Sequence, residues 1–261
     1  MKNKFDLFKN YLKVTYQVAI ICSNFLDIIL AKILNKYIYS LDLRNGLKII
    51  NDGKIGKADL SMFSETWYYH NYNPKGFELK SSYIVFDIGA NNGYYTLFAS
   101  VKAKKVYAFE PLEKLFNKIE KTLKYNNIQN VVLENLGVSD KKEVIAFYES
   151  KLHDGCHSLY RRDKSDIEIK IQTINLEEYC RENNISKIDL LKLDCEGAEY
   201  KIFESLSDSF LKNTLGKVSM ECHDDIVSGK THILIADLLK RNNFEVKIIK
   251  GFLYAVNYNQ K

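Results

Sequence analysis

The sequence predicts an α/β protein with a mostly parallel sheet and helices on both faces of that sheet. From Tyr83 onward, short β-branched and aromatic runs alternate with segments of helical hydrophobic spacing. The run 187–197 is apolar with almost no alternation, as in a strand that is covered on both faces. A turn containing Gly89 and Gly93 joins the first strand to the first helix, which is typical of nucleotide-binding units of the Rossmann type.

The expected elements follow one another along the chain as β-α-β-α-β, an insertion, and α-β-α-β-α-β-β. The first five are strand 83–89, helix 92–100, strand 105–111, helix 113–127 and strand 130–139. Two strands of the insertion, 144–150 and 167–174, come next. They precede helix 175–183, strand 187–197, helix 199–213, strand 217–224, helix 231–243 and a closing pair of strands within 244–259. A Lys-Gly turn joins that pair, so we expect an antiparallel last strand. Ligands of such sheets bind at the carboxyl ends of the strands, so functional residues should directly follow strands.

We expect two parts, a helical N-terminal extension with a connector (1–75) and the α/β domain (76–261). The most apolar N-terminal stretch is 14–34, whose charge-free part, Val14 to Leu26, has only 13 residues. That is too short to span a bilayer. It predicts an amphipathic helix packed on the domain. Peripheral docking on a membrane surface is the alternative, because lysines precede the stretch at positions 2, 4, 9 and 13.

Composition indicates a globular protein of the cytoplasm. The 261 residues are 46% hydrophobic and 27% charged, and the formal net charge of +5 is scattered along the chain. We therefore expect no nucleic-acid partner, whereas anionic lipid or glycan partners stay open. The five cysteines form no CxxC pair, which disfavours a disulfide framework or a zinc site and fits a reducing compartment. The N-terminal stretch also lacks a cleavage site of the signal-peptide type.

The turn after the first predicted strand indicates a cofactor without a pyrophosphate. Asp87, Gly89 and Gly93 form D-x-G-x-x-x-G, and Asn91 stands where a dinucleotide fingerprint has its middle glycine. That glycine allows a pyrophosphate to approach closely. The carboxylate of Asp87 would repel a phosphate but suits a cationic ligand. S-adenosylmethionine carries an ammonium and a sulfonium and no phosphate, so we assign these residues, with Ala90, to binding of this cofactor.

Two further acidic residues extend the predicted cofactor site. Glu110 follows Gly89 by 21 residues at the end of the second strand, a distance at which acidic residues commonly accept hydrogen bonds from ribose hydroxyls. Asp140 follows the third strand, where it would accept from the adenine amino group or cap a turn.

Several motifs together resemble the FkbM family of class I S-adenosylmethionine-dependent methyltransferases. They are "FDIGANNGYYT", "AFEP", "NLGVSD", "DGCHSLY", "IDLLKLDCEGAE" and "MECHD", within about Tyr83 to Asp224. The most specific is "LKLDCEGAE", close to the family's K-x-D-x-E-G-x-E. The resemblance implies a Rossmann-like methyltransferase fold and O-methylation, often of sugar hydroxyls. It leaves the first 75 residues uncovered, and the family often has a small residue where His157 stands.

Removal of the acceptor's proton requires a base or a metal ion, because a sugar hydroxyl is a weak acid. The best candidates are Asp194, Glu196 and His223, at the ends of two predicted strands. A neutral histidine would take the proton. Alternatively, these three residues with Glu221 would form a divalent metal site.

Other polar residues near these strand ends have secondary interpretations. Glu199 would act in the site or cap a helix, and Lys192 would pair with a carboxylate or hold the substrate. His153 and His157 would contact the acceptor.

The sequence thus predicts an S-adenosylmethionine-dependent O-methyltransferase that acts on a sugar hydroxyl of a glycan or glycan precursor. One alternative is an oxidoreductase that uses a nicotinamide dinucleotide, which the missing middle glycine and Asp87 disfavour. The other is a non-catalytic protein that keeps the fold, which the carboxylates at several strand ends disfavour.

Overall fold

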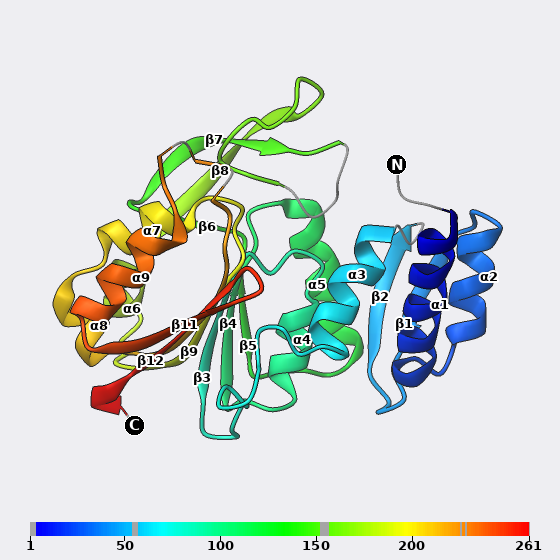
Figure 1. The fold of residues 1–261 in the computed structure, drawn as a ribbon, viewed down its shortest axis with the longest axis horizontal. Helices are drawn as coiled ribbons and strands as arrows, with labels where there is room; N and C mark the ends of the chain where they lie inside the picture. The colour runs from blue at the N-terminus through cyan, green and yellow to red at the C-terminus, as the bar shows by residue number, and fades with distance from the viewer. Residues whose placement is uncertain (1–3, 54–56, 152–156, 225, 228, 261) are drawn as a thin grey trace.

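A seven-stranded sheet forms the centre of the protein in a computed structural model, which describes residues 4–53, 57–151, 157–224, 226–227 and 229–260 (Figure 1). The strand order is β11-β12-β10-β9-β3-β4-β5. The strands are β3 (Ile84–Ile88), β4 (Lys105–Phe109), β5 (Val131–Glu134), β9 (Ile188–Leu193), β10 (Leu215–Glu221), β11 (Phe244–Ile249) and β12 (Phe252–Asn257). Only β12 runs antiparallel to its neighbours in this sheet. The predicted fold class, including the antiparallel last strand, is confirmed.

The strand order reverses beside β3, which pairs with β4 on one side and with β9 on the other. The chain first builds β3, β4 and β5 outward and then returns to add β9 and β10 on the opposite side of β3. At such a switch point the loops after neighbouring strands diverge and leave a crevice. The residues that follow β3, β4, β9 and β10 therefore meet at one edge of the sheet.

Helices cover both faces of the sheet. One face carries α4 (Tyr94–Ser100) and α5 (Glu113–Tyr125). The other carries α6 (Leu176–Glu182), α7 (Glu199–Ser205), α8 (Asp208–Asn213) and α9 (His232–Arg241). Alternating residues of β3 point to the two faces, so Val85 packs with the α4 side and Phe86 with the α6 side.

The N-terminal part is a small unit that packs against α4 and α5. It contains α1 (Lys4–Ile21), α2 (Phe25–Ile33), an antiparallel hairpin of β1 (Ile38–Asp42) and β2 (Lys48–Gly53), and α3 (Lys57–Trp67). Its core packs on Tyr94 and Leu97 of α4. The backbone of β2 bonds to α5 side chains, since the Ile50 amide donates to Thr122 Oγ1 at 3.1 Å.

The hairpin and α3 are absent from the sequence expectation, which had irregular structure after the first helices. These elements depend on tertiary partners, because a lone hairpin is marginally stable in water. The division into 1–75 and 76–261 stays a prediction.

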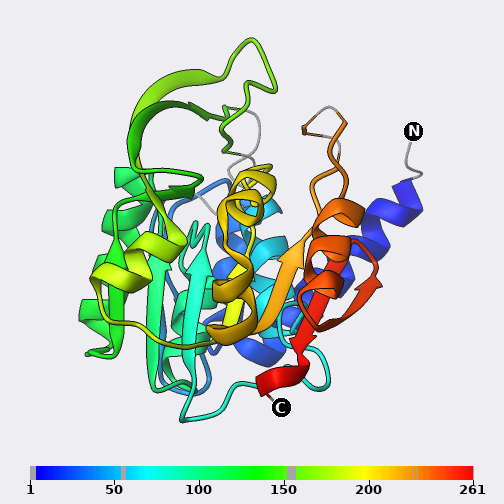
Figure 2. The same cartoon turned by 90° about the vertical axis from the view of Figure 1, so that its left-hand side faces the viewer.

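A second, three-stranded sheet stands above the carboxyl edge of the central sheet (Figures 1 and 2). It is formed by β6 (Gly137–Ser139), β7 (Glu143–Glu149) and β8 (Ile167–Asn175). The prediction of one strand over 130–139 is therefore wrong. The chain bends at Asn135, whose side-chain amide donates to the carbonyls of Glu110 and Pro111, and the second half pairs with β8.

The prediction of one helix over 199–213 is also wrong, because the chain is extended at Leu206 and restarts as α8. Ser207 caps α8 by accepting from the amide of Phe210. The predicted turn between the closing strands is confirmed: Lys250 and Gly251 both have positive φ, as a tight hairpin turn requires.

Candidate active site

The loop after β3 is pressed against the end of β9. Gly89 has φ +77°, and a Cβ there would lie 1.9 Å from the carbonyl oxygen of Asp194. Gly93 has φ +75°, and its Cβ would lie 2.8 Å from Ile119 of α5. These two glycines are needed for packing within the protein, rather than only for a ligand's approach. Between them, Asn91 adopts φ +50°, which asparagine tolerates better than most residues.

Asp87 lies beneath this loop in a buried ion pair. Its Oδ1 is 2.9 Å from Nζ of Lys192 on β9, and Thr96 donates to its Oδ2 at 2.6 Å. Lys192 also donates to the carbonyl of Gly89 at 2.7 Å. Asp87 has no exposed surface, and its carboxylate faces Lys192 and Thr96, so its contact with a cationic ligand stays a prediction. The ion pair between Asp87 and Lys192 holds the loop in place. Pairing with a carboxylate was one of the two roles that the sequence suggested for Lys192.

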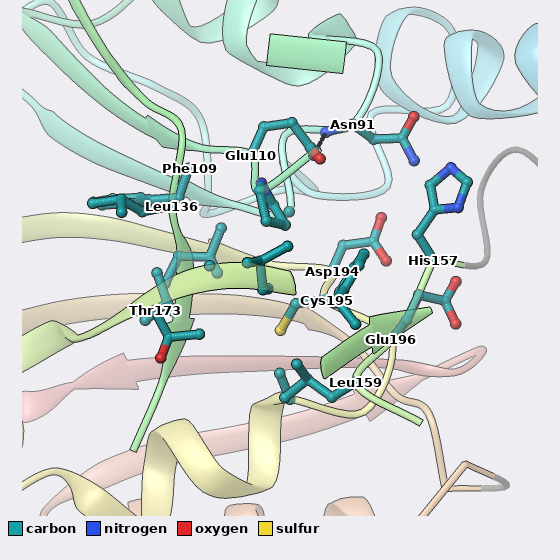
Figure 3. A pocket seen from close by; sticks show the side chains of 18 residues that line it. Asn91, Phe109, Glu110, Leu136, His157, Leu159, Thr173, Asp194, Cys195 and Glu196 are labelled. Carbon is teal, nitrogen blue, oxygen red and sulfur yellow. Dashed lines mark hydrogen bonds between the residues drawn. The ribbon is translucent and has the colours of Figure 1, made fainter. Parts of the chain in front are cut away.

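A pocket opens between this loop, the end of β4 and the three-stranded sheet (Figure 3). Its empty space is about 570 Å³, including the part that is open to solvent at its mouth. Apolar side chains line much of it: Phe109, Leu136, Val138, Phe147, Leu159 and Ile171. Gly89, Asn91, Glu110, Asp194 and Glu196 contribute its polar side. An apolar pocket with a few polar groups suits a ligand with one flat apolar part and one polar part.

Glu110 is held at the polar side of this pocket by two backbone amides. Its Oε2 accepts from the amide of Asn91 at 2.7 Å, and its Oε1 accepts from that of Leu112 at 2.9 Å. Burial raises the pKa of Glu110 to about 7, although both amide hydrogen bonds lower it. Each carboxylate oxygen has a second lone pair available for a ligand's hydroxyl groups.

A second pocket adjoins the first, and both are lined by Gly89, Asn91 and Asp194. Its other walls include Ala90 and Lys192, together with residues of the N-terminal part: Met62, Glu65, Thr66 and Tyr72. Sequence reasoning missed these N-terminal residues. The aromatic run "WYYHNYNPKG" drew attention to a connector that contains Tyr72, but nothing in its pattern indicates which tyrosine turns inward.

Asp194, Glu196 and His223 come together at the ends of β9 and β10. Nε2 of His223 lies 3.7 Å from Oδ1 of Asp194 and 3.8 Å from Oε2 of Glu196. Its Nδ1 lies 2.9 Å from the buried carboxylate of Glu199, which also accepts from the amides of Cys195 and Gly197. Glu199 therefore orients the imidazole and closes the loop after β9, besides beginning α7.

Two more side chains hold the carboxylates of this cluster. The hydroxyl of Tyr72 donates to Oδ2 of Asp194 at 2.7 Å and lies 3.2 Å from Oε2 of Glu221. Arg162, from the segment before β8, forms an ion pair with Glu196 at 2.8 Å. Tyr72 thus joins the ends of two strands through one hydroxyl.

The electrostatics of the cluster make its carboxyl groups candidates for proton transfer near neutral pH. Burial raises the pKa of Glu196 to about 7 and that of Glu221 to about 8, with the charge of Asp194 adding to both shifts. Burial alone would lower the pKa of His223, but the hydrogen bond with Glu199 and the carboxylates around it raise that pKa to about 10. These interactions favour the protonated form of His223 at neutral pH, whereas the sequence suggests a neutral base, and the role of His223 in the reaction stays a prediction.

The remaining sequence candidates lie at different distances from these pockets. His157 lines the first pocket, and its Nδ1 accepts from the amide of Ser150 at 3.0 Å. Asp140 accepts from Ser139 and lies 3.9 Å from Nζ of Lys201, outside the residues that line either pocket. This position fits the turn role rather than the adenine contact. His153 lies outside the described residues.

Comparisons with known proteins identify relatives of the chain. A family model described as the methyltransferase FkbM domain matches residues 87–246. The chain is 27% identical to the 31-O-demethyl-FK506 methyltransferase FkbM of Streptomyces tacrolimicus, over 83% of this chain and 92% of that protein. It is 25% identical to the AMB antimetabolite synthetase AmbE of Pseudomonas aeruginosa, over 72% of this chain but only 11% of that much longer protein.

Among solved structures, the methyltransferase FkbM from Methylobacillus flagellatus KT matches with a TM-score of 0.47 and 12% identity, over 76% of this chain and 51% of that chain. The family match extends over more than half of the sequence and includes the loop after β3 and the ends of β9 and β10. The chain therefore belongs to the FkbM methyltransferase domain family.

Proposed function

We propose that the protein is an S-adenosylmethionine-dependent O-methyltransferase that acts on a hydroxyl group, in a sugar of a glycan or glycan precursor. The observation that carries the proposal is the cluster of Asp194, Glu196 and His223 beside the pocket that holds Glu110. A pocket with apolar walls lies there beside groups that titrate near neutral pH, as transfer to a weakly acidic hydroxyl requires.

The two adjoining pockets fit the two ends of this cofactor. The apolar walls of the first pocket suit the adenine, and Glu110 has acceptor oxygens for the ribose hydroxyls. The second pocket suits the methionine end, because Glu65 and Asp194 line it and carboxylates attract an ammonium group. When bound, S-adenosylmethionine supplies a methyl group activated by its sulfonium.

The residues of the cluster would remove the proton of the acceptor hydroxyl and balance the charge around it. The acceptor's oxygen gains a methyl group and loses its proton, which needs an acceptor of suitable pKa. Glu196 and Glu221, with pKa values of about 7 and 8, are the groups that fit. Protonated His223, whose Nε2 lies 3.7 Å from Asp194 and 3.8 Å from Glu196, offsets the negative charge of these carboxylates rather than acting as the base.

A divalent cation is a second occupant for which this cluster offers ligands. One ligand atom from each of Asp194, Glu196 and His223 lies within 4.8 Å of the others, and Glu199 orients the imidazole as carboxylates do behind many metal-bound histidines. The cation would have to displace the proton of His223 and the ion pair between Arg162 and Glu196. Calorimetry with Mn²⁺ tests this arrangement: binding that His223→Ala abolishes supports it, and no heat of binding rejects it.

The choice of a hydroxyl acceptor is supported by the relative from Streptomyces, whose name describes transfer to an O-demethyl compound. The direct test combines methyl-labelled S-adenosylmethionine with glycan and lipid-linked saccharide fractions of the source cells. We expect the label in a methyl ether that survives mild alkali. Label in an amine or in a methyl ester would reject O-methylation of a sugar.

Calorimetry separates this function from the dinucleotide alternative. S-adenosylhomocysteine should bind, and NAD should not. Binding of NAD without binding of S-adenosylhomocysteine would reject the proposal. If the protein binds S-adenosylhomocysteine while Glu196→Gln and Glu221→Gln both leave label transfer unchanged, its base lies elsewhere.

A further inference from the structure

The first two helices expose an unusual number of large apolar side chains. They lie at the end of the molecule remote from α8 and α9, and α2 is the outermost element there (Figure 1). Side chains of α1 that are about half exposed recur every four residues at Leu12, Tyr16 and Ile20, which places them on one face of the helix. This stripe points away from the buried residues Gln17 and Val18.

Helix α2 shows the same property more strongly. Leu26, Leu30 and Ile33 are 61%, 53% and 63% exposed, and their spacing of four and three residues puts them on one face. Ile28, on another side of the helix, is buried against the N-terminal core. A short surface helix that is apolar on both its inner and outer sides is expected to have its outer side covered by a partner.

The charges and aromatic residues around these stripes indicate what that partner is. The first 40 residues contain six lysines and two aspartates, a net charge of +4 out of the chain's +5. Lys13 of α1 and Lys36 after α2 are exposed, the former with its Nζ 5.2 Å from the centre of the Tyr69 ring, and Asp27 of α2 is an exposed acidic residue. Exposed Tyr37 and Tyr39 follow α2, and tyrosine favours the boundary between lipid and water. Among the described residues, no helix is long and apolar enough to cross a membrane.

We propose that this face, the exposed apolar stripe of α2 (Leu26, Leu30 and Ile33) together with that of the neighbouring α1 (Leu12, Tyr16 and Ile20), docks the protein on the surface of an anionic phospholipid bilayer. The aliphatic side chains enter the boundary between head groups and acyl chains, and the lysines contact the anionic head groups. A protein partner of ordinary charge would not explain the excess of lysines in the first 40 residues. Two signals, apolar and electrostatic, are what stable peripheral attachment requires.

Vesicle flotation tests the proposal with the full-length chain. The wild type should float with vesicles of equal parts phosphatidylcholine and phosphatidylglycerol, and stay unbound with phosphatidylcholine alone. The triple variant Leu26→Ser, Leu30→Ser, Ile33→Ser should lower the partition coefficient between vesicle and water by roughly a hundredfold. The reason is that about half of the surface of each aliphatic side chain would no longer be transferred from water into lipid. Lys13→Glu with Lys36→Glu should lower it by roughly tenfold or more. Added salt should weaken binding of the wild type.

A matched control is offered by α9 and β11, where Ile233, Leu234 and Ile249 are 54%, 49% and 51% exposed. Their triple change to serine should leave flotation unchanged, and both triple variants should unfold at similar temperatures. The proposal is overturned if the wild type fails to float with anionic vesicles, or if the α2 variant floats as the wild type does. A wild-type dimer that the α2 variant turns into a monomer, without vesicle binding, would assign the face to a second copy of the chain. Because flotation requires no turnover, its outcome is separate from that of the proposed methyl transfer.

Discussion

Replacing Glu110 by glutamine should reveal both the buried charge and the ribose contact of the first pocket. In the unliganded protein the carboxyl has a pKa of about 7 because it is buried, compared with an ordinary value of 4.5. The folded state therefore holds this proton more tightly than the unfolded state. The linked stability is present below pH 4.5 and is lost as the pH rises through 7. The full loss is about 3 kcal/mol, of which about 2 kcal/mol falls between pH 5.5 and pH 8.

Glutamine has the shape of the glutamate side chain but does not titrate. It keeps one acceptor oxygen, so one of the two amides that now bond to Glu110 loses its partner, at a cost of about 1–3 kcal/mol. Glu110→Gln should thus be destabilising at pH 5.5 and close to neutral at pH 8. Urea unfolding of both proteins at the two pH values measures the difference. The exposed Glu113→Gln, three residues later, serves as the control and should show no such pH dependence.

Cofactor binding should show the opposite trend with pH. Hydroxyl donors of a ribose stabilise the ionised carboxylate, so binding requires Glu110 to lose its proton. At pH 6 only about a tenth of a group with a pKa near 7 is ionised, and the affinity for S-adenosylhomocysteine should rise about tenfold between pH 6 and pH 8. Glu110→Gln should remove this rise and weaken binding at pH 8 by roughly tenfold. If the wild-type affinity is flat with pH and the variant binds equally well at pH 8, Glu110 does not contact the ribose.

Three further substitutions test the interactions behind the loop and the cluster. Lys192→Met should lower the free energy of unfolding by about 3–5 kcal/mol, since it leaves a buried carboxylate unpaired. The control Lys187→Met, at a half-exposed ion pair, should lower it by under about 1 kcal/mol. Equal losses in urea unfolding would contradict this difference. His223→Gln should reduce single-turnover methyl transfer about a hundredfold or more while S-adenosylhomocysteine binds within about threefold of the wild type; unchanged turnover would exclude a role in the reaction. Tyr72→Phe removes a hydrogen bond that lowers the pKa of Glu221, so the acidic limb of the pH profile of kcat should move to higher pH, and a limb that stays in place would show that Glu221 is not the titrating group.

The sequence predicted the parts of the fold that depend on local patterns. The continuous apolar run of β9 and the paired carboxylates after strands could be recognised because strand period and topology place them at one edge of the sheet. The boundary between β5 and β6 could not be recognised. Both halves of 130–139 have strand composition, and only the bond from Asn135 to the end of β4 shows where the chain turns to a different sheet.

The sequence named residues that the fold brings close together, but it did not indicate their partners within the protein. Asp87 and Gly93 lie at the two ends of the loop after β3, as their motif implied. Their neighbours, however, are Lys192 and Ile119 of the same protein rather than a ligand. Sequence spacing cannot distinguish a carboxylate that faces a ligand from one that faces a lysine on the next strand. The protonation of His223 is likewise a property of the assembled cluster, because it depends on the buried carboxylate of Glu199.

The N-terminal part contributes both to the second pocket and to the surface that we propose for lipid. Residues 87–246 match the family model and contain Glu110, Asp194, Glu196 and His223, which we propose for cofactor binding and proton transfer. One wall of the second pocket comes from α3 and the connector, which precede that match. The same part of the chain presents the apolar and cationic face that we propose for lipid. A bilayer under α1 and α2 would contact the same N-terminal part whose α3 and connector border the second pocket. On this ground we propose a saccharide carried on a lipid as the acceptor. If soluble and lipid-linked forms of one saccharide were methylated equally well with and without anionic vesicles, the two features would be independent.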